Sequence, residues 1–244
     1  MSRNEIMSDW LRNNRTDWYA YMSDAVESRN LRSCSAEKTG RRVRRGQKRR
    51  EEIVAIADRI FLERGFTETT MQLIAARAGA SKETLYRHFG NKEELFAEIV
   101  RRRSARITGG QDGGLDMNGT PHEVLGRLGL NLLQFLTRAD SLSFYRIMVA
   151  EAGRAPELGR IFYAQGPGGG HRQLASYLGH ATQRGELRCP APELAAKLFL
   201  GSIVANHQTL GLFAPGLEPF KAKKMRAHVE EAVALFLARY GPSP

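Results

Sequence analysis

Residues 70–92 read TMQLIAARAGASKETLYRHFGNK, and this stretch decides the fold. It predicts two short helices joined by a tight turn. In the first helix, apolar residues recur at the spacing of one helical face, and Thr70 stands before them as an N-cap. Gly79 has no Cβ, which lets the chain reverse after this helix. Ser81 then takes the N-cap position of a second helix, Lys82–Phe89.

The second helix has two unlike faces. Leu85 and Phe89 are four residues apart and are predicted to face inward. The remaining side chains are donors and acceptors that point outward: Lys82, Glu83, Thr84, Tyr86, Arg87 and His88. A helix this short is not stable alone, so a neighbouring helix must brace it. A braced short helix with a polar, positively charged outer face is suited to the major groove of DNA.

The same stretch resembles the helix-turn-helix of TetR/AcrR-family transcriptional repressors, whose signature runs IA..AG.S..TLY.HF..K. The matching residues are Ile74, Ala75, Ala78, Gly79, Ser81, Thr84, Leu85, Tyr86, His88, Phe89 and Lys92. The resemblance extends back to an RGF sequence at residues 64–66 and covers residues 47–103. It implies a DNA-binding domain of three helices.

Carried over position by position, the resemblance implies two kinds of DNA contact. The implied base readers are Lys82, Glu83 and Thr84. The implied phosphate contacts are Tyr86, His88 and Lys92, helped by side-chain or helix N-terminal donors at Thr70 and Ser81. Arg87 reaches either a base or a phosphate.

The flanking helices support this pair. Residues 51–64 carry apolar side chains at the i, i+3, i+4, i+7 spacing of one helical face, and Gly65 ends that helix. Asn91 is predicted to cap the next helix, with Glu94 completing a capping box. The arginines within residues 101–106 stand near its end, where cations suit the helix dipole.

The chain is strongly basic, and its charge is uneven. The formal net charge is +11, from 37 Lys and Arg against 26 Asp and Glu. Residues 1–106 hold 23 basic and 15 acidic residues, whereas residues 107–244 hold 14 and 11. Residues 38–50, KTGRRVRRGQKRR, hold eight basic residues and no acid. Such a run is usually disordered alone, but next to a helix-turn-helix it predicts an arm on DNA phosphates or in a minor groove.

Other functional classes lack their signatures. The two cysteines, Cys34 and Cys189, have no metal-like spacing and suit a reducing compartment. The six histidines form no HxxxH or HExxH pattern, so no metal site or cofactor is predicted. No GxSxG or recognisable carboxylate pair suggests an enzyme. No apolar run is long enough to span a bilayer and residues 1–30 lack a signal-peptide core, so a cytoplasmic location without a membrane partner is predicted.

After a glycine-rich linker at residues 107–119, the chain reads as helices. They are predicted from Thr120, from Asp140, and over residues 157–165, 171–184, 193–212 and 219–240. The GPGGG sequence at residues 166–170 is predicted to separate two of these helices. It does not favour a phosphate-binding loop, because no strand precedes it and no GxGxxG or GK[ST] pattern is present. No stretch alternates as a strand does, so the predicted fold class is all-α.

The body also resembles a known domain. AEAGRAPELGRIFYAQGP at residues 150–167 and PELAAKLFLG at residues 192–201 are similar to the AefR-like C-terminal domain of one branch of the family. The resemblance covers residues 124–213 and implies an effector site between helices. The candidate lining residues are Phe135, Tyr145, Met148, Phe162, Tyr163, His171, Tyr177 and His207. Aromatic residues at helical spacing are more often plain core, and that alternative stays open for each.

Four segments are therefore expected. They are a polar extension and basic arm at residues 1–46 without fixed structure, a TetR-type DNA-binding domain at 47–106, the linker at 107–119, and a helical effector-binding and dimerisation domain at 120–244. The predicted function is a homodimeric repressor, paired through its last two helices, that binds a pseudo-palindromic double-stranded operator through Lys82–Phe89. An unidentified small-molecule effector releases it. The alternative is a sequence-indifferent, cationic nucleic-acid-binding protein that acts mainly through residues 38–50.

Overall fold

The structure is a computed structural model that describes residues 46–110, 114–214 and 222–242. The chain divides after Glu52 into two compact units, and residues 46–52 of the first are helical. All other described elements belong to the second unit, Ile53–Pro244. The predictions for residues 1–45, which include most of the basic arm, fall outside the described residues.

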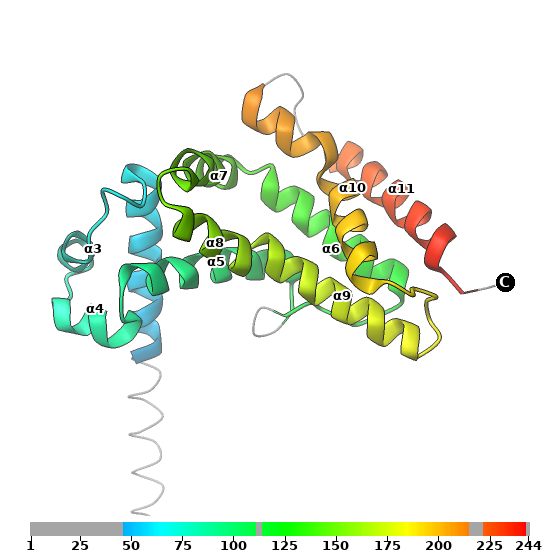
Figure 1. Cartoon of the computed structure of the whole chain (residues 1–244), viewed down its shortest axis with the longest axis horizontal. Coiled ribbons are helices and arrows are strands. Elements are labelled where there is room, and N and C mark those ends of the chain that lie inside the picture. The colour runs from blue at the N-terminus through cyan, green and yellow to red at the C-terminus, as the bar shows by residue number, and fades with distance from the viewer. Residues whose placement is uncertain (1–45, 111–113, 215–221, 243–244) are drawn as a thin grey trace, which may run out of the picture. The chain divides into compact units, whose positions relative to one another are not determined.

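The second unit is built from helices, and its described residues contain no strand (Figure 1). Its first helix covers residues 53–64. The others are α3 (Met71–Ala78), α4 (Lys82–Phe89), α5 (Lys92–Thr108), α6 (Pro121–Leu136), α7 (Ala139–Ala152), α8 (Pro156–Gln165), α9 (Pro167–Gln183), α10 (Pro192–Phe213) and α11 (Ala222–Tyr240). The all-α prediction is confirmed. We call residues 53–90 the head and helices α6–α11 the body, with α5 running between them.

The first hydrophobic core joins the head to α5, α7 and α8, and it is built on aromatic rings. Phe61 stacks on Phe66 with ring centroids 5.5 Å apart, and Phe96 of α5 meets both rings edge-on at 5.8 and 5.4 Å. Phe144 of α7 stacks on Phe96 at 6.0 Å. Head and body therefore share one continuous core in this region.

The second core lies among α6, α9, α10 and α11. Phe199 of α10 meets Phe236 of α11 edge-on at 5.4 Å. On α6, Gly129 allows a close approach of both helices. A Cβ at this position would lie 2.9 Å from Ile203 Cδ1 and 3.0 Å from Val229 Cγ1. This packing fixes α10 and α11 side by side against α6 (Figure 1).

One predicted helix boundary is wrong. The GPGGG sequence was expected to separate two helices, with the second starting at residue 171, yet α9 begins at Pro167. The break is confined to Gly166, whose φ and ψ are −99° and −108°. Pro167 occupies the first turn, where its missing N–H costs nothing. Gly168 packs tightly, because a Cβ there would lie 2.9 Å from the Tyr163 carbonyl oxygen. Glycine at this position therefore fits the close packing, although its helix propensity is low.

The segment between α5 and α6 is anchored at its described ends. Helix α5 continues through Thr108, and Gly109 ends it with a φ of 68°. Gly109 forms an isolated bridge with Leu115. Asp116 donates its N–H to the Thr108 carbonyl at 3.0 Å, and its carboxylate lies 3.1 Å from Arg127 Nε on α6. The domain limits drawn from the sequence stay a prediction.

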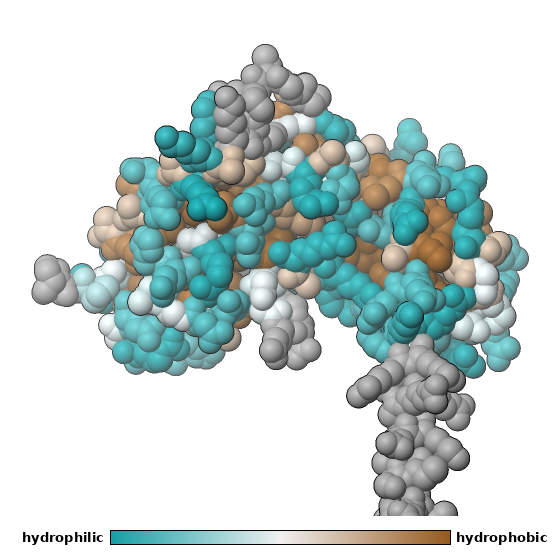
Figure 2. All heavy atoms as spheres, turned by 180° about the vertical axis from the view of Figure 1, so that it is seen from behind, coloured by the Kyte–Doolittle hydropathy of each residue, from teal (hydrophilic) through white to brown (hydrophobic). Residues whose placement is uncertain are grey.

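Apolar residues also reach the surface. On the face shown in Figure 2, hydrophobic patches interrupt the hydrophilic surface. Large exposed apolar side chains include Leu194, Leu198 and Phe213 on α10 and Leu235 on α11. Within the described ranges, no helix has the length and apolar character needed to cross a membrane.

Substitution of two glycines of α6 by alanine tests the packing of the second core. Gly126 has no atom within 4 Å of an added Cβ, so Gly126→Ala should raise the free energy of unfolding by about 1 kcal/mol through helix propensity. Gly129→Ala pushes the same methyl group against Ile203 and Val229. We expect the Gly129→Ala protein to be less stable than the Gly126→Ala protein by about 1–3 kcal/mol. Urea unfolding measures both, and equal free energies of unfolding would contradict the packing.

Candidate DNA-binding interface

The helix-turn-helix is fixed by the local signals that the sequence contains. The Thr70 hydroxyl accepts the Leu73 N–H at 3.2 Å and caps α3. Gly79 ends α3 in the left-handed region, with a φ of 58°. The Ser81 hydroxyl accepts the Thr84 N–H at 3.1 Å and caps α4. The predicted N-caps Thr70 and Ser81 and the predicted turn glycine Gly79 are confirmed.

Helix α4 presents the two faces expected of a recognition helix. Leu85 and Phe89 are buried in the first core. Lys82, Glu83 and Arg87 are exposed, as is Tyr86 with 44% of its surface accessible. The Lys82 ammonium lies 6.0 Å from the Tyr86 ring centroid. Several donors and acceptors therefore share one accessible surface.

The remaining predicted DNA contacts differ in their surroundings. Thr70 and Ser81 are exposed at the N-termini of α3 and α4, where free N–H groups can reach a phosphate. The Thr84 hydroxyl lies 2.8 Å from the Ser81 hydroxyl, so these two side chains already hydrogen-bond to each other. His88 is half-buried, and its ring centroid lies 6.0 Å from that of Phe89.

Lys92 is engaged inside the protein. Its ammonium donates to the Phe66 carbonyl at 2.9 Å and lies 4.1 Å from the centroid of the Phe66 ring. An ammonium has three N–H donors, so this contact leaves donors for a phosphate. Lys92 thus has a structural role that the sequence motif did not reveal.

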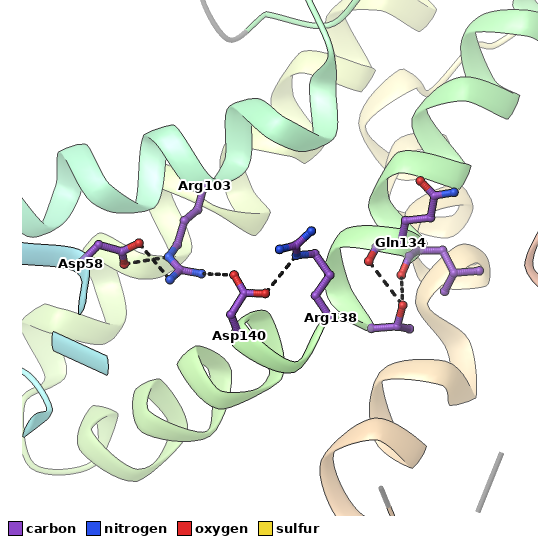
Figure 3. A network of polar contacts seen from close by, with 7 residues as sticks. Asp58, Arg103, Gln134, Arg138 and Asp140 are labelled. Carbon is purple, nitrogen blue, oxygen red and sulfur yellow. Dashed lines mark hydrogen bonds and ion pairs between the residues drawn. The ribbon is translucent and has the colours of Figure 1, made fainter. Parts of the chain in front are cut away.

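A polar network centred on the buried Arg103 side chain joins the head to α5 and α7 (Figure 3). The Arg103 side chain is only 7% exposed, and its guanidinium donates to both carboxylate oxygens of Asp58 at 2.9 and 3.0 Å. The Arg103 guanidinium carbon also lies 4.5 Å from the centroid of the Phe144 ring. The spacing of Arg103 in α5 did not indicate this buried ion pair with Asp58.

The same network continues to the first turn of α7. Arg103 Nη1 lies 3.7 Å from Asp140 Oδ2, and Arg138 Nε donates to Asp140 Oδ1 at 2.9 Å. Burial alone would raise the pKa of Asp140, but the hydrogen bond and charge of Arg138, with the charge of Arg103, hold it below its ordinary value. Asp140 is therefore a carboxylate at neutral pH.

Sequence reasoning missed a second link between head and body. Glu151, near the end of α7, accepts hydrogen bonds from the turn that follows the first head helix. One signal was available, since an acidic residue in the last turn of a helix is placed against the helix dipole. Nothing local in the sequence indicates its partner, which lies more than 80 residues earlier.

The eight candidate effector residues are divided between different places. Met148 is buried in the first core, and the partly buried Phe162 packs against this core. The centroids of the Phe162 and Tyr145 rings are 6.0 Å apart. Tyr177 belongs to the second core. His207 meets His228 edge-on at 4.7 Å. Phe135 and His171 are half-buried, and Tyr163 is exposed. Their role in effector binding stays a prediction.

Two of these residues have polar atoms that are buried without a hydrogen-bond partner among the described residues: Tyr177 Oη and His171 Nδ1. Burial raises the pKa of Tyr177, and the charge of Glu186 adds to the rise. Burial lowers the pKa of His171, and the charge of Lys197 acts in the same direction. Both side chains are therefore biased toward their neutral forms.

The described residues offer no metal centre, since no group of three or more His, Cys, Asp or Glu side chains in them could hold an ion. Cys189 is a free, buried thiol in the second core. Burial raises the pKa of this thiol, so it is a poor nucleophile at neutral pH. Cys34 falls outside the described residues.

Removing one partner of the buried ion pair tests the network. Asp58→Ala leaves the Arg103 guanidinium buried without its bidentate partner, and we expect the free energy of unfolding to fall by about 3 kcal/mol. The control is Glu63→Ala, because Glu63 pairs with Arg77 at 3.7 Å and both side chains are more than half exposed. That change should cost less than about 1 kcal/mol. Urea unfolding compares the two, and similar losses would contradict the buried network.

Two family models match this chain. The family model described as bacterial regulatory proteins, tetR family, matches residues 53–99. The model for the C-terminal domain of AefR-like transcriptional repressors matches residues 123–242. Together the two models match more than half of the chain.

Curated relatives match mainly through a short region. The transcriptional activator FasR of Mycolicibacterium smegmatis is 34% identical over 79 residues, which are 32% of this chain and 36% of FasR. The transcriptional repressor BepR of Brucella suis biovar 1 is 40% identical over 53 residues, which are 22% of this chain and 25% of BepR. The chain thus spans less than half the length of the curated relatives that it matches.

Solved structures match over most of the chain. A TetR-family transcriptional regulator from Mesorhizobium loti MAFF303099 is 29% identical with a TM-score of 0.64, over 81% of this chain and 98% of that chain. The flavonoid-responsive regulator FrrA is also 29% identical, with a TM-score of 0.62, over 81% of this chain and 100% of its own. This chain belongs to the TetR family, whose members are DNA-binding transcriptional regulators and not enzymes, and it carries an AefR-like C-terminal domain.

Proposed function

We propose that the protein is a homodimeric repressor that binds a pseudo-palindromic operator through α4 and leaves it when a small molecule binds the body. The observation that carries this proposal is α4 itself, a short helix capped by Ser81, braced by the first core, and polar on its outer face. In this proposal Lys82, Glu83 and Thr84 read bases, and Arg87 contacts a base or a phosphate. Tyr86, His88, Lys92, Thr70 and Ser81 bind phosphates.

The surface of α10 and α11 supports a dimer. Leu194 and Leu198 are four residues apart on α10, so they share one face, and both are more than half exposed. Leu235 on the neighbouring α11 is 64% exposed. Exposed leucines on two adjacent long helices are typical of an interaction surface. A two-fold axis through this surface buries the same residues from both copies and pairs two heads with the two halves of an operator.

The proposed effector site lies among the helices of the body. Its candidate residues, which the fold distributes over more than one place, are Phe135, Tyr145, Met148, Phe162, Tyr163, His171, Tyr177 and His207. The similarity to FrrA supports an effector-responsive body, because that regulator is described as flavonoid-responsive. The direction of regulation rests on the repressors among the relatives, such as BepR and the KstR2 repressor of Mycolicibacterium smegmatis. An activator, FasR, is also among them.

The first test concerns base reading by α4. The probe is a duplex selected from a random-sequence library by the wild-type protein, compared with a scrambled duplex. We expect Lys82→Ala and Thr84→Ala to weaken binding to the selected duplex by about tenfold or more, because a base contact contributes about 1–3 kcal/mol of discrimination. Binding to the scrambled duplex should change much less. Fluorescence anisotropy at two salt concentrations measures these affinities.

The control for that test is Lys223→Ala, which removes the same charge from an exposed position on α11. It should leave the preference for the selected duplex intact. If the α4 variants lose affinity equally on both duplexes, the sequence-indifferent cationic protein acting through residues 38–50 becomes the better account.

The second test concerns the dimer. Leu198→Glu and Leu235→Glu each place a charge in the proposed interface, where burying it without a partner is strongly unfavourable. We expect these variants to sediment as monomers at micromolar concentration, to keep their helical circular dichroism, and to lose operator binding. The control is Met117→Glu, at an exposed apolar residue outside α10 and α11. Wild-type protein that sediments as a monomer would overturn the proposed interface.

A further inference from the structure

We propose that Glu151 of α7 is a positioning residue for operator binding. It fixes the turn that follows the first helix of the head, and thereby sets the orientation of the head. Arg146, on the same helix, extends this link to the end of α10. The inference rests on the proposed dimer and its operator. It adds a specific role, the selection of half-site spacing, to a residue outside the helix-turn-helix.

The Glu151 carboxylate binds the turn with both oxygens. Oε1 accepts the Phe66 N–H at 3.1 Å, and Oε2 accepts the Thr67 N–H at 3.0 Å and the Thr67 hydroxyl at 2.8 Å. Hydrogen bonds to a charged acceptor are about twice as strong as those between neutral groups. Two successive backbone N–H groups also fix the direction of the peptide, which an apolar contact does not. The carboxylate therefore restrains the turn in both position and orientation.

The location of Glu151 indicates that this contact is specific. It stands in the last turn of α7, where the helix dipole disfavours a negative charge. The compensating N–H groups come from the head and not from α7. Gly65 leaves room for this approach, because a Cβ at that position would clash with Glu151 Oε1. The φ of Gly65 is 75°, so glycine is favoured there for two independent reasons.

The restrained turn is connected to the recognition helix. On the side opposite the N–H groups, the Phe66 carbonyl accepts a hydrogen bond from Lys92 at 2.9 Å. Lys92 is the first residue of α5 and follows α4 after only Gly90 and Asn91. The Phe66–Thr67 segment therefore lies between a carboxylate of the body and an ammonium adjacent to α4. A displacement of α7 would reach α4 through these contacts.

Helix α7 also contacts the end of α10. Arg146 Nη2 donates to the carbonyls of Gly211 and Leu212 at 2.8 and 2.9 Å. These are among the last carbonyls of α10, which lack partners within the helix and attract a cation. Helix α7 thus hydrogen-bonds both to the head and to the end of a proposed dimer helix. The distance between the two heads of a dimer then depends on α7 as well as on α5.

The experiment compares Glu151→Gln and Glu151→Ala with the wild-type full-length chain. The glutamine keeps the size of the side chain but turns one acceptor oxygen into an NH₂ group that faces an N–H donor. The matched control is Glu157→Gln on α8, since Glu157 is exposed and pairs with Arg160 at 3.3 Å. The probes are a duplex selected by the wild-type protein, a scrambled duplex, and versions of the selected duplex with one base pair added or removed between the half-sites.

We expect both Glu151 variants to bind the selected duplex about tenfold or more weakly than wild type, because charge-assisted hydrogen bonds are lost. Binding to the scrambled duplex should be unchanged. The variants should also discriminate less between the altered spacings, since their heads are less restrained. Amide hydrogen exchange at Phe66 and Thr67 should be faster in both variants, whereas thermal unfolding reports any loss of the fold.

The outcomes separate the two proposals. If the wild-type protein does not distinguish the selected duplex from the scrambled one, the proposed function fails. A second outcome is that the wild-type protein distinguishes the two duplexes and the Glu151 variants keep its affinity and spacing preference, although their amides at residues 66 and 67 exchange faster. Glu151 is then a structural residue only, and the inference is overturned. A variant that loses affinity for every duplex in proportion to its lost stability overturns it as well.

Discussion

The head depends on one continuous cluster of aromatic rings. Phe61 and Phe66 pack against Phe96 of α5, and Phe144 of α7 stacks on the Phe96 ring. Each such pair contributes about 0.5–1.5 kcal/mol beyond the burial of its area. Because α4 packs into the same core, the direction of the recognition helix is tied to the position of α5 and α7.

Polar links give this apolar contact a defined geometry. The Arg103 guanidinium joins the head at Asp58 to the start of α7 at Asp140, and Glu151 joins the end of α7 to the turn at residues 66 and 67. Apolar cores tolerate small shifts, whereas bidentate ion pairs and paired N–H groups are directional. Helix α7 is therefore held against the head at both of its ends. The α7 side chains that make these links, Asp140 and Glu151, lie outside the helix-turn-helix.

The sequence predicted the elements whose causes are local. Thr70, Gly79 and Ser81 act within a few residues of where they stand, so the caps, the turn and the faces of α4 followed from spacing. The start of α9 did not, because a Cβ at Gly168 would lie 2.9 Å from the Tyr163 carbonyl oxygen, a restriction that propensity does not include. Arg103 and Glu151 were missed for the same reason. Their partners are 45 and more than 80 residues away, and only the packed structure brings them together.

In the proposed dimer, two heads held at a fixed separation read DNA through α4. Hydroxyl-radical footprinting of the full-length protein on a duplex that it has selected measures this directly. The account predicts two protected patches about one helical turn apart, with centres about 10 base pairs from each other on a pseudo-palindromic sequence. A single patch, or even protection along the whole duplex, would contradict it.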